Sequence, residues 1–133
     1  MHILMCNDDG ILADGLRHLA SYLSQYYRIT VVAPANEQSA KSHALTTEVP
    51  LKLDAYNGED ENPRLYALTG TPSDCMKFGL SYLLTDDMPD LVISGINHGF
   101  NLGSDVLYSG TVSAAMESCF YGIPGLALSV ERY

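Results

Sequence analysis

Hydrophobic and polar residues alternate along this chain in blocks, and the spacing within a block indicates strand or helix. Short apolar runs that stop at polar or proline-containing turns predict strands. These runs are His2–Cys6, Arg28–Ala33, Arg64–Leu68, Leu91–Ile93 and Leu126–Val130. Val49, Leu51 and Leu53 alternate with polar neighbours, which predicts one further, half-exposed strand.

Between these runs, apolar residues recur at helical spacing. From Asp14 onward a stripe predicted to face a core comprises Leu16, Leu19, Ala20, Leu23 and Tyr27. A second helix is predicted to begin at Pro72, and a third spans Gly110–Tyr121. Strands that alternate with helices favour a parallel sheet covered on both faces. Residues 1–133 are therefore predicted to form one α/β domain with three layers and a Rossmann-like, mostly parallel sheet.

Polar clusters follow three of the predicted strands. They are Asn7–Gly10, Asn36–Ser42 and Gly95–Asp105. Ligands of open α/β sheets bind beyond the carboxyl ends of the strands, so these three loops are expected to converge on one site.

Composition narrows the range of ligands. The 133 residues are 47% hydrophobic and 17% charged, which is typical of a globular domain. Seven basic and sixteen acidic side chains give a net charge of −9, which argues against a nucleic-acid polymer as partner, since such binding relies on cationic neutralisation of phosphates. A single phosphate group can still bind where backbone amides or a metal ion reverse the local field.

The cysteines and the apolar segments bear on the cellular compartment. Cys6, Cys75 and Cys119 lie far apart with no Cys-x-x-Cys pair, which indicates reduced thiols. The apolar start is interrupted at Asn7, unlike a signal peptide, and no run is long enough for a membrane span. We expect a cytoplasmic protein with no membrane partner.

Asp8 and Asp9 form an adjacent carboxylate pair directly after the first strand. Like charges side by side are unfavourable unless a positive group intervenes, and a divalent cation would supply it. The neighbouring loops offer the oxygen donors Ser39, Ser42, Asn97 and Asn101, a set that suits Mg²⁺ or Mn²⁺ rather than zinc. Helix capping explains an aspartate pair here equally well, and the residues alone leave both interpretations open.

Ser109, Gly110 and Thr111 open the third predicted helix. Small residues at a helix N-terminus let backbone N–H groups approach a phosphate, although a plain helix cap explains them too. A P-loop pattern and the Gly-x-Ser-x-Gly elbow of serine hydrolases are both absent from the sequence. An aspartyl-phosphate mechanism of the dehalogenase type is also disfavoured, because its two aspartates are separated by one residue.

Taken together, several segments resemble the stationary-phase survival protein SurE family of nucleotidases. The matching segments, in the family's order, are Ile3–Gly10, Val31–Ala40, Leu68–Cys75, Pro89–Glu117 and Gly122–Ser129. The Pro89–Glu117 block is the most specific of them. One departure is Ala40, where the family usually has glycine.

The resemblance implies a role for particular residues. One divalent ion per subunit, Mg²⁺ or Mn²⁺, would be held by Asp8, Asp9, Ser39 and Asn97. Ser109, Gly110 and Thr111 would bind the phosphate, and Asp105 would take part in proton transfer while Asp8 or Asp9 orients the attacking water. The expected activity is that of a 5′-nucleotidase, an acid-phosphatase-like hydrolase that cleaves nucleoside 5′- and 3′-monophosphates and, in some members, short polyphosphate.

The resemblance also implies a longer architecture. Family members extend further, and their carboxyl-terminal portion supplies a catalytic histidine and an arm exchanged between subunits in homodimers or homotetramers. We therefore expect residues 1–133 to be the amino-terminal part of such an architecture. The alternative hypothesis is a catalytically inert module that binds a metal ion or a nucleotide.

Overall fold

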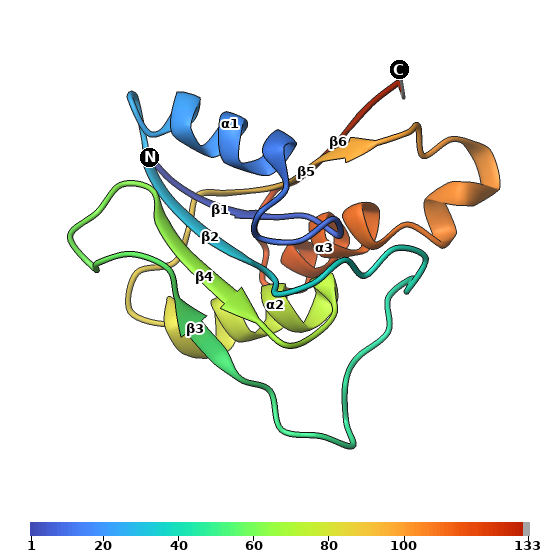
Figure 1. Cartoon of the computed structure of the whole chain (residues 1–133), viewed down its shortest axis with the longest axis horizontal. Helices are drawn as coiled ribbons and strands as arrows, with labels where there is room; N and C mark the ends of the chain where they lie inside the picture. Colours follow the sequence, from blue (N-terminus) through green and yellow to red (C-terminus); the bar gives the residue numbers. More distant parts are fainter. Residues whose placement is uncertain (132–133) are drawn as a thin grey trace.

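The computed structural model describes residues 1–131, in which six strands form one sheet in the order β3-β4-β2-β1-β5-β6 (Figure 1). All neighbouring strands are parallel except β3, which runs antiparallel to β4. The strands are β1 (His2–Cys6), β2 (Arg28–Pro34), β3 (Leu53–Ala55), β4 (Arg64–Leu68), β5 (Leu91–His98) and β6 (Gly125–Val130).

Helices cover both faces of this sheet, as Figure 1 shows. Helix α1 (Asp14–Leu23) packs on one face, and α2 (Pro72–Phe78) and α3 (Gly110–Cys119) pack on the other. Side chains of β1 alternate between the two cores: Ile3 and Met5 contact the α1 side, whereas Leu4 and Cys6 contact the α2 and α3 side. The predicted three-layer, mostly parallel α/β fold is confirmed.

Two short helical segments extend this frame. Helix α2 continues into a π-helical stretch, η1 (Gly79–Leu83), and a 3₁₀ turn, η2 (Gly103–Leu107), precedes α3. No helix in the part of the chain that the structure describes has the length and apolar character needed to cross a lipid bilayer.

Two predicted elements differ in extent from those observed. The strand expected around Val49–Leu53 begins only at Leu53, because its partner β4 ends at Leu68 and the chain then turns into the cap of α2. Tyr27 lies beyond the end of α1 and is 38% exposed, because the chain must leave the helix before β2 begins.

The largest difference concerns β5, which was expected to end at Ile93 but continues to His98. Pairing with β6 extends it: Asn97 lies opposite Ser129 and His98 opposite Val130, after a register shift that follows Ser94. Asn97 therefore projects from a strand rather than from a loop, and its position is set by the neighbouring strand.

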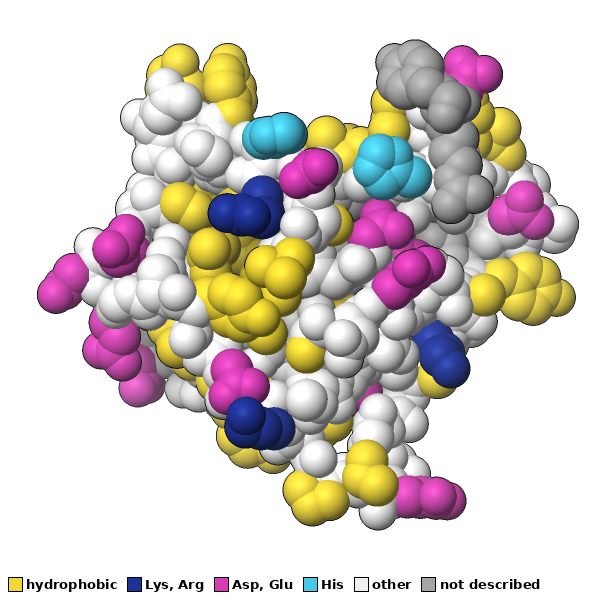
Figure 2. Space-filling model, viewed as in Figure 1, with side chains coloured by type: hydrophobic (Ala, Val, Ile, Leu, Met, Phe, Trp, Pro, Cys, Tyr) yellow, Lys and Arg dark blue, Asp and Glu magenta, His cyan; other side chains and the backbone are white. Residues whose placement is uncertain are grey.

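Charged side chains are spread over the surface. On the face shown in Figure 2, Lys and Arg side chains are few and stand among more numerous Asp and Glu side chains, in keeping with the net charge of −9. The three cysteines are unpaired, and Cys6 and Cys75 are buried in the core under α2.

Candidate metal and phosphate site

The turn after β1 is shaped by Asn7, whose side chain is fully buried. Its Nδ2 donates to the Gly10 carbonyl at 3.0 Å, and its Oδ1 accepts from the Gly10 amide at 3.1 Å. Gly10 has φ +102°, a backbone conformation that side-chain-bearing residues rarely adopt. This closed turn holds the intervening Asp8 and Asp9 at the carboxyl end of β1.

Asp8 is 5% exposed and is oriented by helix α3. The Thr111 hydroxyl donates to Asp8 Oδ1 at 2.6 Å. The helix can approach so closely because residue 110 is glycine: a Cβ atom there would lie only 2.9 Å from Cβ of Asp8. Gly110 and Thr111, predicted to bind phosphate, thus also contact the predicted metal ligand.

Asp9 has a carboxylate oxygen, Oδ2, that is buried and has no hydrogen-bond partner among the described residues. Burial is the main cause that raises the pKa of the Asp9 carboxyl above its ordinary value, and the neighbouring Asp8 charge raises it further, with a smaller opposing effect from His98. A buried, unpaired carboxylate oxygen beside a like charge is costly, and a bound cation would relieve both penalties.

A cavity of about 300 Å³ opens at this edge of the sheet. It brings five of the predicted site residues together: Asp8, Ser39, Asn97, Asp105 and Ser109. The other three, Asp9, Gly110 and Thr111, are not among the lining residues: Asp9 follows Asp8 in the sequence, and Gly110 and Thr111 contact it. The described residues that line the cavity include His98 but no Lys or Arg, so backbone amides or a cation would supply most of the positive field that a phosphate there needs.

The remaining predicted ligands are held by local hydrogen bonds. The Ser39 hydroxyl donates to Glu37 Oε1 at 2.7 Å, and Asn97 Nδ2 donates to the Gly99 carbonyl at 2.8 Å, so that Asn97 Oδ1 is the atom suited to bind a cation. Asp105 lies in η2 and is exposed to solvent.

The two alternative donors that the sequence offered serve other contacts. The Ser42 hydroxyl donates to the Leu107 carbonyl at 2.8 Å, and Asn101 Nδ2 donates to Ser129 Oγ at 2.9 Å. Ser42 thereby joins its loop to η2, and Asn101 joins its loop to β6.

Whether these donors fit a metal ion depends on their chemistry. Within residues 1–131, no group of three or more His, Cys, Asp or Glu side chains is placed to hold a metal. Two carboxylates, a hydroxyl and an amide oxygen form a hard, all-oxygen set, which suits Mg²⁺ or Mn²⁺ and not zinc. Together with the unpaired oxygen of Asp9, this set fits the divalent ion that the resemblance implies.

Several neighbours of the site were not predicted from the sequence. Phe100 lines the cavity, and its only sequence signal is its place in the loop before Ser109. Tyr108, which directly precedes the predicted phosphate-binding residues, lines the cavity as well. The contact from Thr111 to Asp8 spans 103 residues and has no sequence signal at all.

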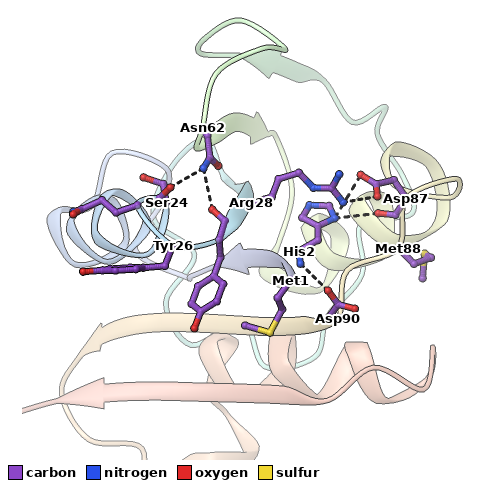
Figure 3. A pocket seen from close by; sticks show the side chains of 11 residues that line it. Met1, His2, Ser24, Tyr26, Arg28, Asn62, Asp87, Met88 and Asp90 are labelled. Atoms are coloured by element: carbon purple, nitrogen blue, oxygen red, sulfur yellow. Dashed lines mark hydrogen bonds and ion pairs between the residues drawn. The ribbon is translucent and has the colours of Figure 1, made fainter.

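A second, larger hollow of about 730 Å³ lies at the opposite, amino-terminal edge of the sheet (Figure 3). In the figure, Arg28 and His2 point toward Asp87, while Asn62 reaches toward Ser24. Arg28 donates to Asp87 Oδ1 at 2.5 Å, and His2 Nε2 contacts Thr30 Oγ1 at 3.0 Å. These groups largely satisfy one another, so we interpret this edge as a structural ion-pair cluster.

Comparison with known proteins places the chain in a family. A family model described as "Survival protein SurE" matches residues 3–133. Proteins named 5′-nucleotidase SurE are 54% identical over 129 residues in Thermoanaerobacter sp. (strain X514) and 50% identical over 130 residues in Vibrio vulnificus (strain YJ016). These alignments cover 97% and 98% of this chain but 50% and 49% of the relatives.

A solved structure agrees with the sequence relatives. The crystal structure of the SurE protein from Aquifex aeolicus superimposes with a TM-score of 0.85 at 43% identity, covering 97% of this chain and 50% of that one. The chain thus spans about half the length of the relatives that it matches. On the extent of the family match and the agreement in fold, this chain belongs to the SurE family of survival proteins.

Proposed function

We propose that this protein is a divalent-metal-dependent phosphomonoesterase that hydrolyses nucleoside 5′-monophosphates to nucleoside and phosphate. The observation that carries the proposal is the unpaired, buried Oδ2 of Asp9 next to Asp8, which lines a cavity together with the oxygen donors Ser39 and Asn97. The relatives named 5′-nucleotidase SurE support the substrate class. Activity on 3′-monophosphates and short polyphosphate is part of the same proposal.

In this proposal Asp8, Asp9, Ser39 and Asn97 hold one Mg²⁺ or Mn²⁺ ion. When bound, the ion would polarise a phosphate oxygen and offset the negative charge of the transition state. The Thr111 hydroxyl keeps Asp8 in one orientation, and Asp8 or Asp9 orients the attacking water.

The amino terminus of α3 would bind the phosphate. Ser109 caps the helix by accepting a hydrogen bond from the Val112 amide at 3.2 Å. The first-turn amides of Gly110 and Thr111 have no partner within the helix and add the positive end of its dipole. Asp105, which lines the cavity and is exposed, would take part in proton transfer.

The test is phosphate release from AMP, GMP, CMP and a 3′-nucleotide, with and without Mn²⁺. Asp8→Asn should lower metal-dependent turnover by about a hundredfold or more, because it weakens both metal binding and water orientation. Asp60→Asn, in an exposed loop, is the matched control and should behave as wild type. Wild-type turnover by Asp8→Asn would show the assignment to be wrong.

Phosphate release also distinguishes the proposed enzyme from the alternative, a catalytically inert module that binds a metal ion or a nucleotide. That alternative predicts that Mn²⁺ with a nucleotide raises the melting temperature while no phosphate is released. Cytoplasmic location, which the unpaired cysteines suggest, and assembly as a homodimer or homotetramer, which the family resemblance suggests, are further proposals. Sedimentation at several protein concentrations tests the assembly.

A further inference from the structure

The loop between β2 and β3 carries Ser39 and is held to the domain by successive polar contacts. The Gln38 amide donates to the Asp8 carbonyl at 2.7 Å, and the Ser42 amide donates to the Tyr108 carbonyl at 3.2 Å. Ala40 and Ser42 both have left-handed backbone conformations, with φ of +57° and +55°. A non-glycine residue in this region needs support from its surroundings to stay there.

A further contact joins His43 of this loop to Glu117. His43 Nε2 lies 2.6 Å from Glu117 Oε2, and the residue Glu117 is only 6% exposed. A carboxylate can only accept, so the ring N–H of His43 is the donor. The Phe120 ring, 6.1 Å from the imidazole, flanks the pair. A buried carboxylate left without a donor would be strongly unfavourable, so Glu117 holds His43, and with it the loop, in place.

Glu117 belongs to α3, the helix that also orients Asp8. At its first turn α3 donates from Thr111 to Asp8, and near its carboxyl end it receives His43 through Glu117. Helix α3 therefore contacts two parts of the proposed metal site: the carboxylate pair, and the loop that carries Ser39.

We propose that His43 and Glu117 form a positioning pair that fixes the Ser39 loop against α3 and thereby sets the affinity of the site for a divalent ion. This inference rests on the proposed function for the role of Ser39, but the anchoring itself does not. Thr46 is also anchored, to Asp74 of α2, and Ser42 is anchored to Leu107 and Tyr108 in the segment before α3. The contact of His43 differs from these because it joins the loop to α3 itself.

Four variants test the pair. His43→Ala removes the donor, and His43→Ala combined with Glu117→Gln also removes the buried charge, so that this double variant folds without an unpaired carboxylate. His43→Gln retains an amide donor and serves as the conservative rescue. Asp87→Asn breaks the ion-pair cluster at the far edge of the sheet and controls for a general loss of stability.

Two measurements apply to each variant: the dissociation constant of Mn²⁺ by calorimetry, and the rate of native-state trypsin cleavage after Lys41, which is exposed within the loop. We expect His43→Ala and the double variant to bind Mn²⁺ about tenfold more weakly and to be cut faster, because supporting residues typically contribute on this scale. His43→Gln should stay closer to wild type. Asp87→Asn should melt earlier with an unchanged dissociation constant.

The outcomes separate this inference from the proposed function. Wild-type Mn²⁺ affinity in the double variant would overturn the positioning role while leaving the metal site intact. Failure of the wild-type protein to bind Mn²⁺ would contradict the proposed function. The anchoring of the Ser39 loop by His43 and Glu117 would then be tested by the rate of tryptic cleavage after Lys41 alone. An unchanged cleavage rate after Lys41 in His43→Ala overturns the anchoring in either case.

Discussion

At residue 110, the absence of a side chain sets how closely α3 approaches the carboxylate pair. A Cβ atom there would lie 2.9 Å from Cβ of Asp8 and 3.1 Å from Cγ of Pro72, both closer than packed atoms normally come. Gly110→Ala should therefore displace Asp8 or the helix, weaken Mn²⁺ binding by about tenfold and lower the free energy of unfolding by about 1–3 kcal/mol.

Mn²⁺ titration calorimetry and urea unfolding would measure both effects of Gly110→Ala. The matched control is Gly58→Ala, where the nearest atom, Glu61 Cγ, is 3.7 Å away. Equal behaviour of the two variants would argue against a close contact between α3 and Asp8.

Asp9 illustrates a conflict between stability and function within one side chain. Its buried oxygen has no partner among the described residues, and the neighbouring Asp8 charge disfavours its ionised form. Asp9→Asn removes a negative charge from this cluster, so without metal the variant should melt a few degrees higher than wild type. Differential scanning calorimetry with and without Mn²⁺ should show that the same variant no longer gains stability from the ion. A lower melting temperature without metal would contradict this account.

Among the elements, α2 depends on a capping box at its amino terminus. The Thr71 hydroxyl accepts from the Asp74 amide at 3.1 Å, and Asp74 Oδ2 accepts from the Thr71 amide at 2.8 Å. Asp74 also accepts from the Thr46 hydroxyl at 2.6 Å. Burial by itself would raise the pKa of the Asp74 carboxyl, but the hydrogen bonds from Thr46 and Thr71 outweigh it, and the pKa lies below its ordinary value of 3.8.

This lowered pKa makes the contribution of Asp74 depend on pH with a definite sign. Since the folded-state pKa is below that of the unfolded chain, the stabilisation is complete above about pH 4 and is lost as the pH falls through the folded-state value. Asp74→Asn should lower the free energy of unfolding by about 1–3 kcal/mol at pH 7, and the difference from wild type should shrink toward pH 2. Urea unfolding across this range measures it, with exposed Asp86→Asn as control.

For the molecule as a whole, the amino-terminal edge of the sheet is joined by one ionic cluster. Asp87, in the segment before β5, contacts Arg28 of β2 at 2.5 Å and Arg64 of β4 at 4.0 Å. His2 of β1 lies beside them and is 3% exposed. Burial, followed by the Arg28 charge, lowers the pKa of His2 below its ordinary value of 6.5, against an opposing effect of Asp87.

A lowered histidine pKa means that the folded state binds the proton less readily than the unfolded chain. The contribution of neutral His2 to the free energy of unfolding is therefore complete above about pH 6.5 and is lost as the pH falls toward the folded-state pKa. The free energy of unfolding changes by at most about 1.4 kcal/mol per pH unit through this group. His2→Gln should flatten this part of the dependence of stability on pH, and a variant at an exposed histidine, His18→Gln, serves as the control. The midpoints of urea unfolding, measured for each variant between pH 5 and pH 8, would show this difference in pH dependence. Parallel curves for wild type and His2→Gln would contradict the assignment.

Local patterns in the sequence were sufficient for the layers of the fold and for the positions of most elements. Apolar periodicity depends only on near neighbours, so β1, β2 and β4 and the starts of all three helices agree with prediction. The oxygen-rich strand ends could be recognised in the same way, because parallel strands bring their carboxyl ends to one edge.

Only the tertiary structure determines the contacts between segments that are distant in the chain. The extension of β5 to Asn97 requires β6, the orientation of Asp8 requires Thr111, and the place of the Ser39 loop requires Glu117. Each contact joins groups whose local sequence patterns are independent of one another, so their meeting is a property of packing. Asp8 and Asp9 could be recognised as a candidate metal site from the sequence, whereas the burial that leaves Asp9 Oδ2 without a partner follows only from the folded chain.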